Sequence, residues 1–192
     1  MTLNLAKAAL LVVDVQNGFV NAGSAPVVPV VVDLTERWAA SGRPIILTRY
    51  LNYTGSPYER LIGWRALYDS PDTDLVDELL PYTEHPNASV LDKTVYTALT
   101  HEGVELLREL NVTDLVICGI ATDACVLKTA LDAFEMDFTP WVIRDAVASN
   151  ATRHPAREIH ESALLLISRL VGAGQVIDAD TVRNALAGAT AA

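Results

Sequence analysis

The sequence predicts an α/β protein in which helices wrap a parallel β-sheet. Apolar, β-branched runs of about five to seven residues recur along the chain and alternate with longer segments of helical period. No repeat, low-complexity tract or interdomain linker interrupts this alternation. With 51% apolar and 20% charged residues, the 192-residue chain is expected to fold as a single domain over residues 1–192.

The apolar runs predict strands, in chain order, at residues 8–13, 44–48, 88–92, 113–118, 139–143 and 174–177. Segments of helical period predict helices near residues 27–41, 57–66, 73–81, 99–111, 124–136 and 155–171. Turn-forming residues separate helix from strand, at 41–44 before the second strand and at 170–174 before the last. Thr100 or Thr97 is expected to cap the fourth helix.

The charge balance argues against nucleic acid and membrane partners. Asp and Glu number 24 against 14 Lys and Arg, for a net charge of −10, so no basic stripe is available to meet phosphate groups. Nowhere do about 18 uncharged apolar residues run together, so no membrane span is predicted. The first apolar run is short and is interrupted by Asp14, which is not typical of a signal peptide. With two cysteines and no CxxC pair, a cytoplasmic protein with reduced thiols is expected.

Three reactive groups follow predicted strands at their carboxyl ends, where open α/β sheets build their sites. Asp14 follows the first strand, Lys93 the third, and the loop 119–125 with Cys125 the fourth. They offer a base, a cation and a thiol. A charge beside a buried strand is costly unless it is paired, so these groups are expected to pair with one another.

Cys125 falls where the segment 124–136 turns helical, with Thr122 or Asp123 as the expected N-cap. The positive end of the helix dipole and a nearby ammonium are expected to lower the pKa of the thiol toward neutrality, which makes a thiolate available to attack a carbonyl. Backbone N–H groups at the same helix start can receive the oxyanion. Cys118 lies inside a strand and is expected to be a buried apolar residue.

Three segments resemble the signatures of a known family: ALLVVDVQNGFV at 9–20, LDKTVYTAL at 91–99 and VICGIATDACVLKTALDAF at 116–134. Their order and spacing resemble those of the isochorismatase-like cysteine hydrolases, a superfamily that includes nicotinamidases and N-carbamoylsarcosine amidases. The resemblance covers nearly the whole chain. It implies a three-layer α/β/α fold with a six-stranded parallel sheet in the order 3-2-1-4-5-6.

The resemblance also implies roles for individual residues. Asp14, Lys93 and Cys125 each match a member of the family's Asp-Lys-Cys triad. A cis peptide bond between Ile120 and Ala121 is implied as well, aiming the amides of Ala121 and Cys125 at the oxyanion. In the implied strand order the third strand lies about 10 Å from the first, so the place of Lys93 in the triad rests on the resemblance.

Two departures from the family pattern narrow the expected chemistry. Zinc-dependent nicotinamidases of the superfamily carry an Asp-x-His pair after strand two, where this chain reads TRYLNY at 48–53, so no metal and no other cofactor is expected. Isochorismatases of siderophore pathways commonly lack the cysteine that this chain keeps. The resemblance therefore implies hydrolysis of a carbon–nitrogen bond rather than of a vinyl ether.

The resulting hypothesis is a cofactor-free amidase that acts on a small molecule. Asp14 takes the Cys125 proton, the thiolate attacks a carbonyl, and water releases a thioester acyl-enzyme. Lys93 is expected to hold both the carboxylate and the thiolate in their charged forms. The alternatives are an isochorismatase-type vinyl-ether hydrolase, a catalytically silent oligomeric scaffold of the same fold, and a nucleotide-binding module. The loop 119–123 lacks the Gly-x-Gly-x-x-Gly pattern that is typical of nucleotide-binding modules, which argues against this third alternative.

The predicted substrate-binding residues are aromatic and lie in or near the site-forming loops: Phe19, Tyr53, Trp64 and Tyr96. Trp38 and Trp141 are expected in the core. Lys128 is expected on a solvated helix surface. None of the four histidines falls at a predicted strand end, which argues against a Cys-His mechanism; His154 and His160 are placed in the helix after the fifth strand.

The apolar residues of the segment 124–136 also indicate that the chain assembles with other copies of itself. One of its faces carries Val126, Ala130 and Ala133, and another carries Leu127, Leu131 and Phe134. This is too apolar for a helix with one solvated side. Together with the family resemblance, it predicts a homo-oligomer, a dimer or a tetramer, with this helix near the interface.

Overall fold

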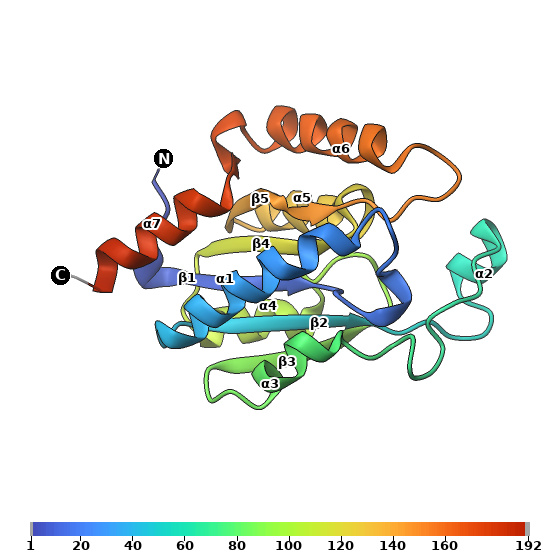
Figure 1. Ribbon diagram of the computed structural model, residues 1–192, viewed down its shortest axis with the longest axis horizontal. Helices are drawn as coiled ribbons and strands as arrows, with labels where there is room; N and C mark the ends of the chain where they lie inside the picture. Colours follow the sequence, from blue (N-terminus) through green and yellow to red (C-terminus); the bar gives the residue numbers. More distant parts are fainter. Residues whose placement is uncertain (1, 191–192) are drawn as a thin grey trace.

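The protein is built on a six-stranded parallel sheet, seen in a computed structural model that describes residues 2–190. The strands run in the order β3-β2-β1-β4-β5-β6, and all neighbours are parallel (Figure 1). Their bounds are β1 Ala8–Val13, β2 Ile45–Tyr50, β3 Ala88–Lys93, β4 Asp114–Ile120, β5 Thr139–Ala148 and β6 Val176–Ile177. The predicted sheet and its strand order are confirmed.

Helices cover both faces of the sheet, which makes three layers (Figure 1). The α-helices are α1 Val28–Ala40, α2 Pro57–Ile62, α3 Leu80–Thr83, α4 His101–Glu109, α5 Leu127–Glu135, α6 Ala156–Leu170 and α7 Ala179–Thr190. Helices α1 and α7 pack on one face of the sheet, and α4, α5 and α6 on the other. Within β1, Leu10 faces the first cluster and Leu11 the second, as the two-residue period of a strand requires. No helix among the described residues is long and apolar enough to cross a membrane.

The predicted core residues are buried, and their polar atoms are satisfied. Trp38 donates from Nε1 to the carbonyl oxygen of Pro44 at 2.9 Å, and Trp141 donates to Oδ1 of Asp114 at 2.9 Å. Cys118 is fully buried in β4, and this burial raises the pKa of its thiol. The predicted roles of these three residues are therefore confirmed.

Several element boundaries differ from the prediction. β5 continues to Ala148, because the exposed Arg144 and Asp145 interrupt the apolar run without ending the strand. Residues 77–83 form only a 3₁₀ turn and the four-residue α3, where a longer helix is predicted. Thr100 is the cap of α4, and its hydroxyl accepts from the amide of Gly103 at 3.1 Å.

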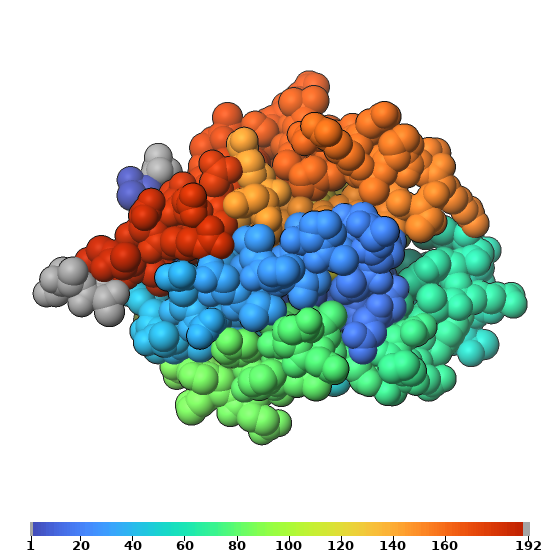
Figure 2. Space-filling model, in the orientation of Figure 1, coloured from blue at the N-terminus to red at the C-terminus, as the bar shows by residue number. Residues whose placement is uncertain are grey.

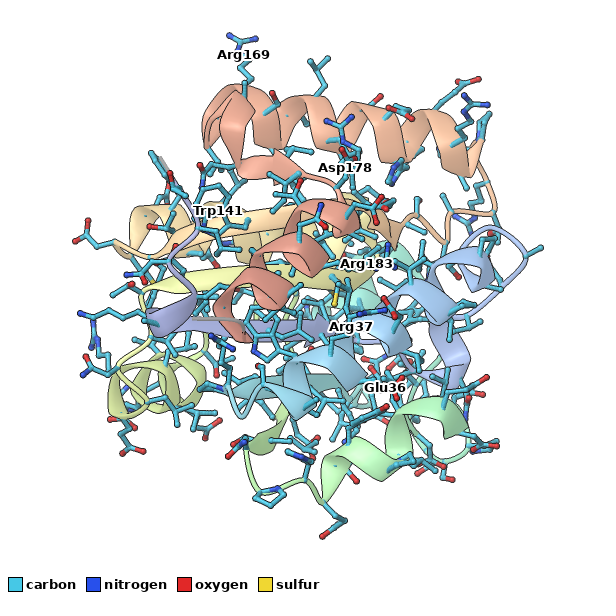
Figure 3. The ribbon with its side chains drawn as sticks, turned by 60° about the vertical axis from the view of Figure 1, so that its left-hand side comes forward. Glu36, Arg37, Trp141, Arg169, Asp178 and Arg183 are labelled. Atoms are coloured by element: carbon cyan, nitrogen blue, oxygen red, sulfur yellow. The ribbon has the colours of Figure 1, made fainter. Side chains whose placement is uncertain are left out.

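The C-terminal helix α7 is not predicted from the sequence. It packs beside α1 through Val182 and Leu186. At the edge of this contact Arg183, which Figure 3 labels on α7, donates from Nε to Oδ2 of Asp33 in α1 at 2.7 Å. Asp33 also accepts from Arg37 one turn further along α1. The helix is thus stabilised by tertiary contacts.

Strand β4 approaches β1 most closely at Gly119, whose φ is +119°. A Cβ at this position would lie 2.0 Å from the carbonyl oxygen of Val13, far inside van der Waals contact. Glycine is required here by the backbone conformation and by the lack of space. Because Asp14 follows Val13 directly, the same approach brings the loop after β4 next to Asp14.

Replacing Gly119 by Ala is expected to lower the free energy of unfolding by about 3 kcal/mol or more, since the added methyl group must displace the backbone of β1. Gly188→Ala is the matched control. Gly188 lies in α7, an added Cβ there meets nothing within 4 Å, and alanine in a helix is favoured by about 0.5 to 1 kcal/mol. Urea unfolding followed by circular dichroism measures both changes. Similar stabilities of the two variants would contradict the close approach.

Candidate active site

Three side chains from separate strands meet at the carboxyl edge of the sheet. Asp14 follows β1, Lys93 ends β3, and Cys125 lies in the segment after β4. The Nζ of Lys93 is 2.6 Å from Oδ2 of Asp14, and both side chains are fully buried. The Cys125 thiol lies close enough to both groups to interact with each of them. The structure thus brings together the three side chains that are expected to pair.

Asp14 is held from two sides. Its backbone has φ +48°, a left-handed conformation that aspartate tolerates better than most residues. The hydroxyl of Thr48 donates to Oδ1 at 2.6 Å, and the amide of Asp14 donates to the same hydroxyl oxygen at 3.1 Å. With Lys93 on Oδ2, both carboxylate oxygens have a donor, so the carboxyl group has one defined orientation.

Lys93 reaches Asp14 across the end of β2. Its Nζ lies 5.5 Å from the centre of the Tyr50 ring, and Tyr50 is the residue paired with Lys93 in the sheet register. The ammonium also donates to the carbonyl oxygens of Val95 and Tyr96, both at 3.0 Å, so its three protons have acceptors. Burial alone would lower the pKa of Lys93, but Asp14 and Cys125 raise it, and the net pKa lies above its ordinary value. Lys93 therefore stays charged.

The pKa of the Cys125 thiol is shifted in the direction opposite to the prediction. Cys125 is 3% exposed. Burial raises the pKa of its thiol, Asp14 raises it further, and Lys93 lowers it, with a net value well above the ordinary one. The charge of Lys93 is already neutralised by Asp14 at 2.6 Å, so it does not offset the loss of water around the sulfur. The direction of this shift is opposite to the expected lowering, and it favours the neutral thiol beside the ion pair.

The helix that carries Cys125 also begins differently from the prediction. Thr122–Val126 form a π-helix that continues into α5, and Ala121 precedes it without a side-chain cap. The hydroxyl of Thr122 makes a 2.9 Å hydrogen bond with Nδ1 of His160 in α6. Oδ1 of Asp123 is buried and has no hydrogen-bond partner among the described residues. Neither predicted residue caps the helix; Thr122 instead ties this segment to α6.

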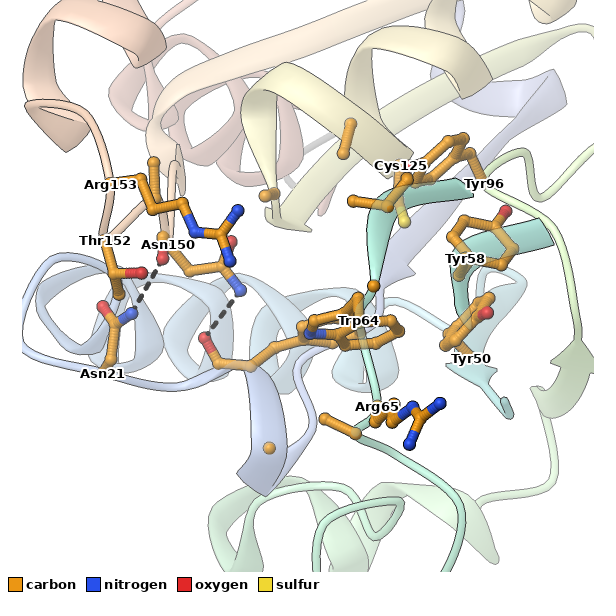
Figure 4. A pocket seen from close by; sticks show the side chains of 18 of the residues that line it. Asn21, Tyr50, Tyr58, Trp64, Arg65, Tyr96, Cys125, Asn150, Thr152 and Arg153 are labelled. Carbon is orange, nitrogen blue, oxygen red and sulfur yellow. Dashed lines mark hydrogen bonds between the residues drawn. The ribbon is translucent and has the colours of Figure 1, made fainter. Parts of the chain in front are cut away.

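A cavity of about 560 Å³ opens at this edge of the sheet, a size that suits a small molecule. Cys125 lines the cavity (Figure 4). Ala121, which is expected to share the oxyanion site with Cys125, lines it too. The peptide bond between Ile120 and Ala121, where the family resemblance places a cis bond, is cis in this structure.

One side of the cavity is aromatic, and its rings belong to Phe19, Tyr50, Tyr58, Trp64 and Tyr96. Phe19 and Trp64 are stacked with ring centres 5.9 Å apart, and Tyr58 meets Tyr96 edge-on at 4.9 Å. Three of the four aromatic residues predicted from the sequence therefore line the cavity. Tyr50 and Tyr58 are not predicted, although the position of Tyr50 at the carboxyl end of β2 is a signal that could have found it.

Tyr53 is the exception among the predicted aromatic residues. It lies outside the cavity, with 48% of its surface exposed. Oδ1 of Asn52 accepts from the amide of Tyr53 at 3.0 Å and from the hydroxyl of Ser56 at 2.7 Å. These bonds form a tight turn that leaves Tyr53 in solvent, so its predicted place in the substrate pocket is wrong.

The other side of the cavity is polar and comes mainly from the loop between β5 and α6. Its side chains are Asn21, Asn150, Thr152, Arg153 and His154. Arg65 also lines the cavity, next to Trp64 on the aromatic side (Figure 4). None of these six is predicted from the sequence. His154 lies in this loop and not in α6 as expected. Asn21 donates from Nδ2 to the carbonyl oxygen of Asn150 at 2.9 Å, which joins the loops after β1 and β5 (Figure 4). Figure 2 shows the loops after β2 and β5 side by side at this end of the molecule.

No group of three or more His, Cys, Asp or Glu side chains is placed to hold a metal ion within residues 2–190. In the segment 48–53, which carries no Asp-x-His pair, Arg49 forms two hydrogen bonds with Asp92, of 2.7 and 2.8 Å. Lys128 pairs with Asp132 one turn further along α5, as expected for a surface lysine.

Comparison with known proteins finds one family and several relatives. A family model described as the isochorismatase domain matches residues 8–177. An uncharacterized isochorismatase family protein, PncA of Bacillus subtilis (strain 168), is 32% identical over 159 residues, which cover 74% of this chain and 87% of the relative.

Two solved structures are similar over most of the chain. The N-carbamoylsarcosine amidase from Thermoplasma acidophilum has a TM-score of 0.77 and 25% identity, covering 91% of this chain and 97% of its own. The nicotinamidase PncA from Bacillus subtilis has a TM-score of 0.78 and 27% identity, covering 90% and 99%. Both have the three-layer architecture seen here.

Iodoacetamide is expected to modify Cys125 well before Cys118. Cys125 lines the cavity, whereas Cys118 is enclosed within β4. Peptide mapping after short labelling times measures the two modifications separately. Cys125→Ser should remove the early label and leave the unfolding midpoint close to that of the wild type. Faster modification of Cys118 would contradict the accessibility of Cys125.

The pH dependence of Cys125 alkylation is expected to move in opposite directions in two variants. Lys93 lowers the pKa of the thiol and Asp14 raises it, so Lys93→Ala should shift the profile to higher pH and Asp14→Asn to lower pH. A shift of one unit changes the thiolate fraction about tenfold at a given pH below the pKa. Iodoacetamide rate constants from pH 6 to 10 measure this. If both profiles move together, or Lys93→Ala leaves the profile unchanged, the contacts at the sulfur are not those described.

Proposed function

The chain belongs to the isochorismatase family, and from that membership we propose that it is a cysteine hydrolase that cleaves a carbon–nitrogen bond of an amide-type group in a small molecule. The observation that carries the proposal is the buried contact of Asp14, Lys93 and Cys125 beside the cavity. The bond type is supported by two similar structures, an N-carbamoylsarcosine amidase and a nicotinamidase.

In the proposed reaction Asp14 is the general base. The raised pKa of the Cys125 thiol favours its protonated form, and its proton moves to the Asp14 carboxylate as the sulfur attacks the substrate carbonyl. A bond forms between sulfur and carbon, and the π electrons of the carbonyl pass to its oxygen. The amides of Ala121 and Cys125 stabilise the oxyanion.

Asp14 then returns the proton to the leaving nitrogen as the carbon–nitrogen bond breaks, which leaves a thioester on Cys125. A water molecule gives a proton to Asp14 and attacks the thioester carbon. The sulfur–carbon bond breaks, the acid product leaves, and the thiol regains its proton. Lys93 stays charged throughout and, with the Thr48 hydroxyl, keeps the carboxylate in one orientation.

A panel of primary amides, carbamoyl compounds, lactams and isochorismate is expected to contain substrates among the amides or carbamoyl compounds, detected as ammonia release. Cys125→Ala should lower kcat/KM by at least about 10³-fold. Asp14→Asn should lower it by about 10²- to 10⁴-fold, although its thiol ionises more easily. Lys128→Ala, which removes a surface lysine from α5, is the matched control and should keep wild-type turnover.

The outcomes of this panel separate the alternatives. Intact mass measurement with a slow substrate should show the acyl group on Cys125. Turnover of isochorismate alone would replace the amidase proposal by vinyl-ether hydrolysis. Absence of any turnover, together with an unreactive Cys125, would indicate a scaffold without catalytic activity.

We also propose that the chain forms a homo-oligomer through α5 and α6. Leu127 and Leu131 are half-buried, because α6 packs beside α5. The apolar surface that remains is formed by side chains at least half exposed: Phe134, Leu165 and Leu170. Most of it therefore lies on α6, and the helix at 124–136 adds Phe134 at its edge.

Light scattering at micromolar concentration is expected to give the mass of a dimer or a larger assembly. Leu165→Glu should shift the mass toward that of a monomer, because a carboxylate is costly to bury in an apolar interface. Leu80→Glu, at an exposed leucine of α3 on the other face of the sheet, is the control and should leave the mass unchanged. A monomeric wild type would overturn this assembly.

A further inference from the structure

The charge around the cavity differs from that of the rest of the protein. The chain carries a net charge of −10. Among the described residues that line the cavity, however, none is Asp or Glu, while Arg65 and Arg153 both belong to it. At its base the charges of Asp14 and Lys93 cancel. The side chains that line the cavity thus carry a net positive charge in an acidic protein, although Asp123 lies behind them, and a positive lining attracts anions.

Arg153 is the cation in this set that is free to meet a ligand. Arg65 lies 3.2 Å from Glu59 and is partly neutralised by it. Within residues 2–190 no carboxylate lies within 4 Å of the Arg153 guanidinium, and none of the hydrogen bonds uses it as a donor. In Figure 4 the guanidinium extends into the cavity from the polar side, with Cys125 and the tyrosine rings on the other side.

The backbone that carries Arg153 is anchored. Asn150 donates from Nδ2 to the carbonyl oxygen of Phe19 at 3.3 Å and accepts from Asn21 at its own carbonyl. The amide of Ala151 donates to the hydroxyl of Ser149 at 3.2 Å. Because Phe19 stacks on Trp64, these bonds fix the base of Arg153 relative to the aromatic side of the cavity. The guanidinium therefore starts from a defined position beside the rings.

We infer that the substrate carries a carboxylate, which Arg153 binds while the aromatic side chains hold the apolar body of the molecule and its amide-type carbonyl meets Cys125. The inference rests on the proposed function and specifies its substrate class. A guanidinium offers two parallel N–H donors that match the two oxygens of a carboxylate. The aromatic rings suit a planar or apolar body, and the cavity volume of about 560 Å³ limits the substrate to a small molecule.

The test compares two amides that differ in charge, 4-carbamoylbenzoate and its methyl ester, by ammonia release. Wild-type protein should favour the acid in kcat/KM, and the preference should decline at high ionic strength. In Arg153→Gln the ratio of kcat/KM for acid over ester should fall roughly tenfold, mainly through KM. Arg157→Gln, on α6 and outside this cavity, is the matched control and should keep the wild-type ratio.

A second measurement separates this inference from the proposed function. Each compound is tested for protection of Cys125 against iodoacetamide, which requires binding but no turnover. Turnover without a preference for the acid, or an equal loss for acid and ester in Arg153→Gln, would overturn the carboxylate site and leave the amidase proposal standing. Protection by the acid that is lost in Arg153→Gln, without any ammonia release, would retain the site and overturn the amidase. Failure of the acid to bind in either assay overturns the inference.

Discussion

The buried ion pair of Asp14 and Lys93 is the interaction on which the rest of the site depends. Two charges removed from water are costly unless their geometry is good and their remaining hydrogen-bonding atoms are satisfied. Here both conditions hold. The Thr48 hydroxyl donates to the carboxylate oxygen that Lys93 does not bind, and the ammonium donates its other two protons to the carbonyl oxygens of Val95 and Tyr96. The pair joins the ends of β1 and β3 across β2, so the packing of three strands fixes the position of the Asp14 carboxylate.

The same pair determines the state of the thiol. A cysteine beside a lysine is ordinarily expected to ionise easily. In this site the lysine is neutralised by a carboxylate that itself raises the pKa of the thiol, so burial prevails and the net shift favours the protonated Cys125. In the proposed reaction Asp14 is then already placed to accept this proton. The proposal therefore couples deprotonation of Cys125 to its attack on the substrate.

The cavity above this ion pair has an aromatic side and a polar side, which come from different loops. Its aromatic side is assembled from the loop after β1, which carries Phe19, and the long segment after β2, which carries Trp64. Its polar side comes from the loop after β5. Hydrogen bonds of Asn21 and Asn150 join the first loop to the third. Asp14, Lys93 and Cys125 lie at or just after the strand ends, buried under the cavity. The residues placed to contact different parts of a ligand lie mostly on loops, two of which are joined by hydrogen bonds.

The sequence by itself determined what depends on local pattern. Strand and helix periods predicted the parallel α/β fold. That Asp14, Lys93 and Cys125 meet was expected because parallel strands end at one edge of a sheet, and the place of Lys93 was expected from the resemblance to a known family. Quantities that depend on distances between separate segments were decided only by the tertiary structure. Three cases show this. They are the cancellation of charge at Cys125, the turn that places Tyr53 in solvent, and the loop that brings Arg153 to the cavity. The helix α7 is a fourth case, because it is stabilised by packing on α1. The residue pattern of one segment does not show which other segment will pack against it.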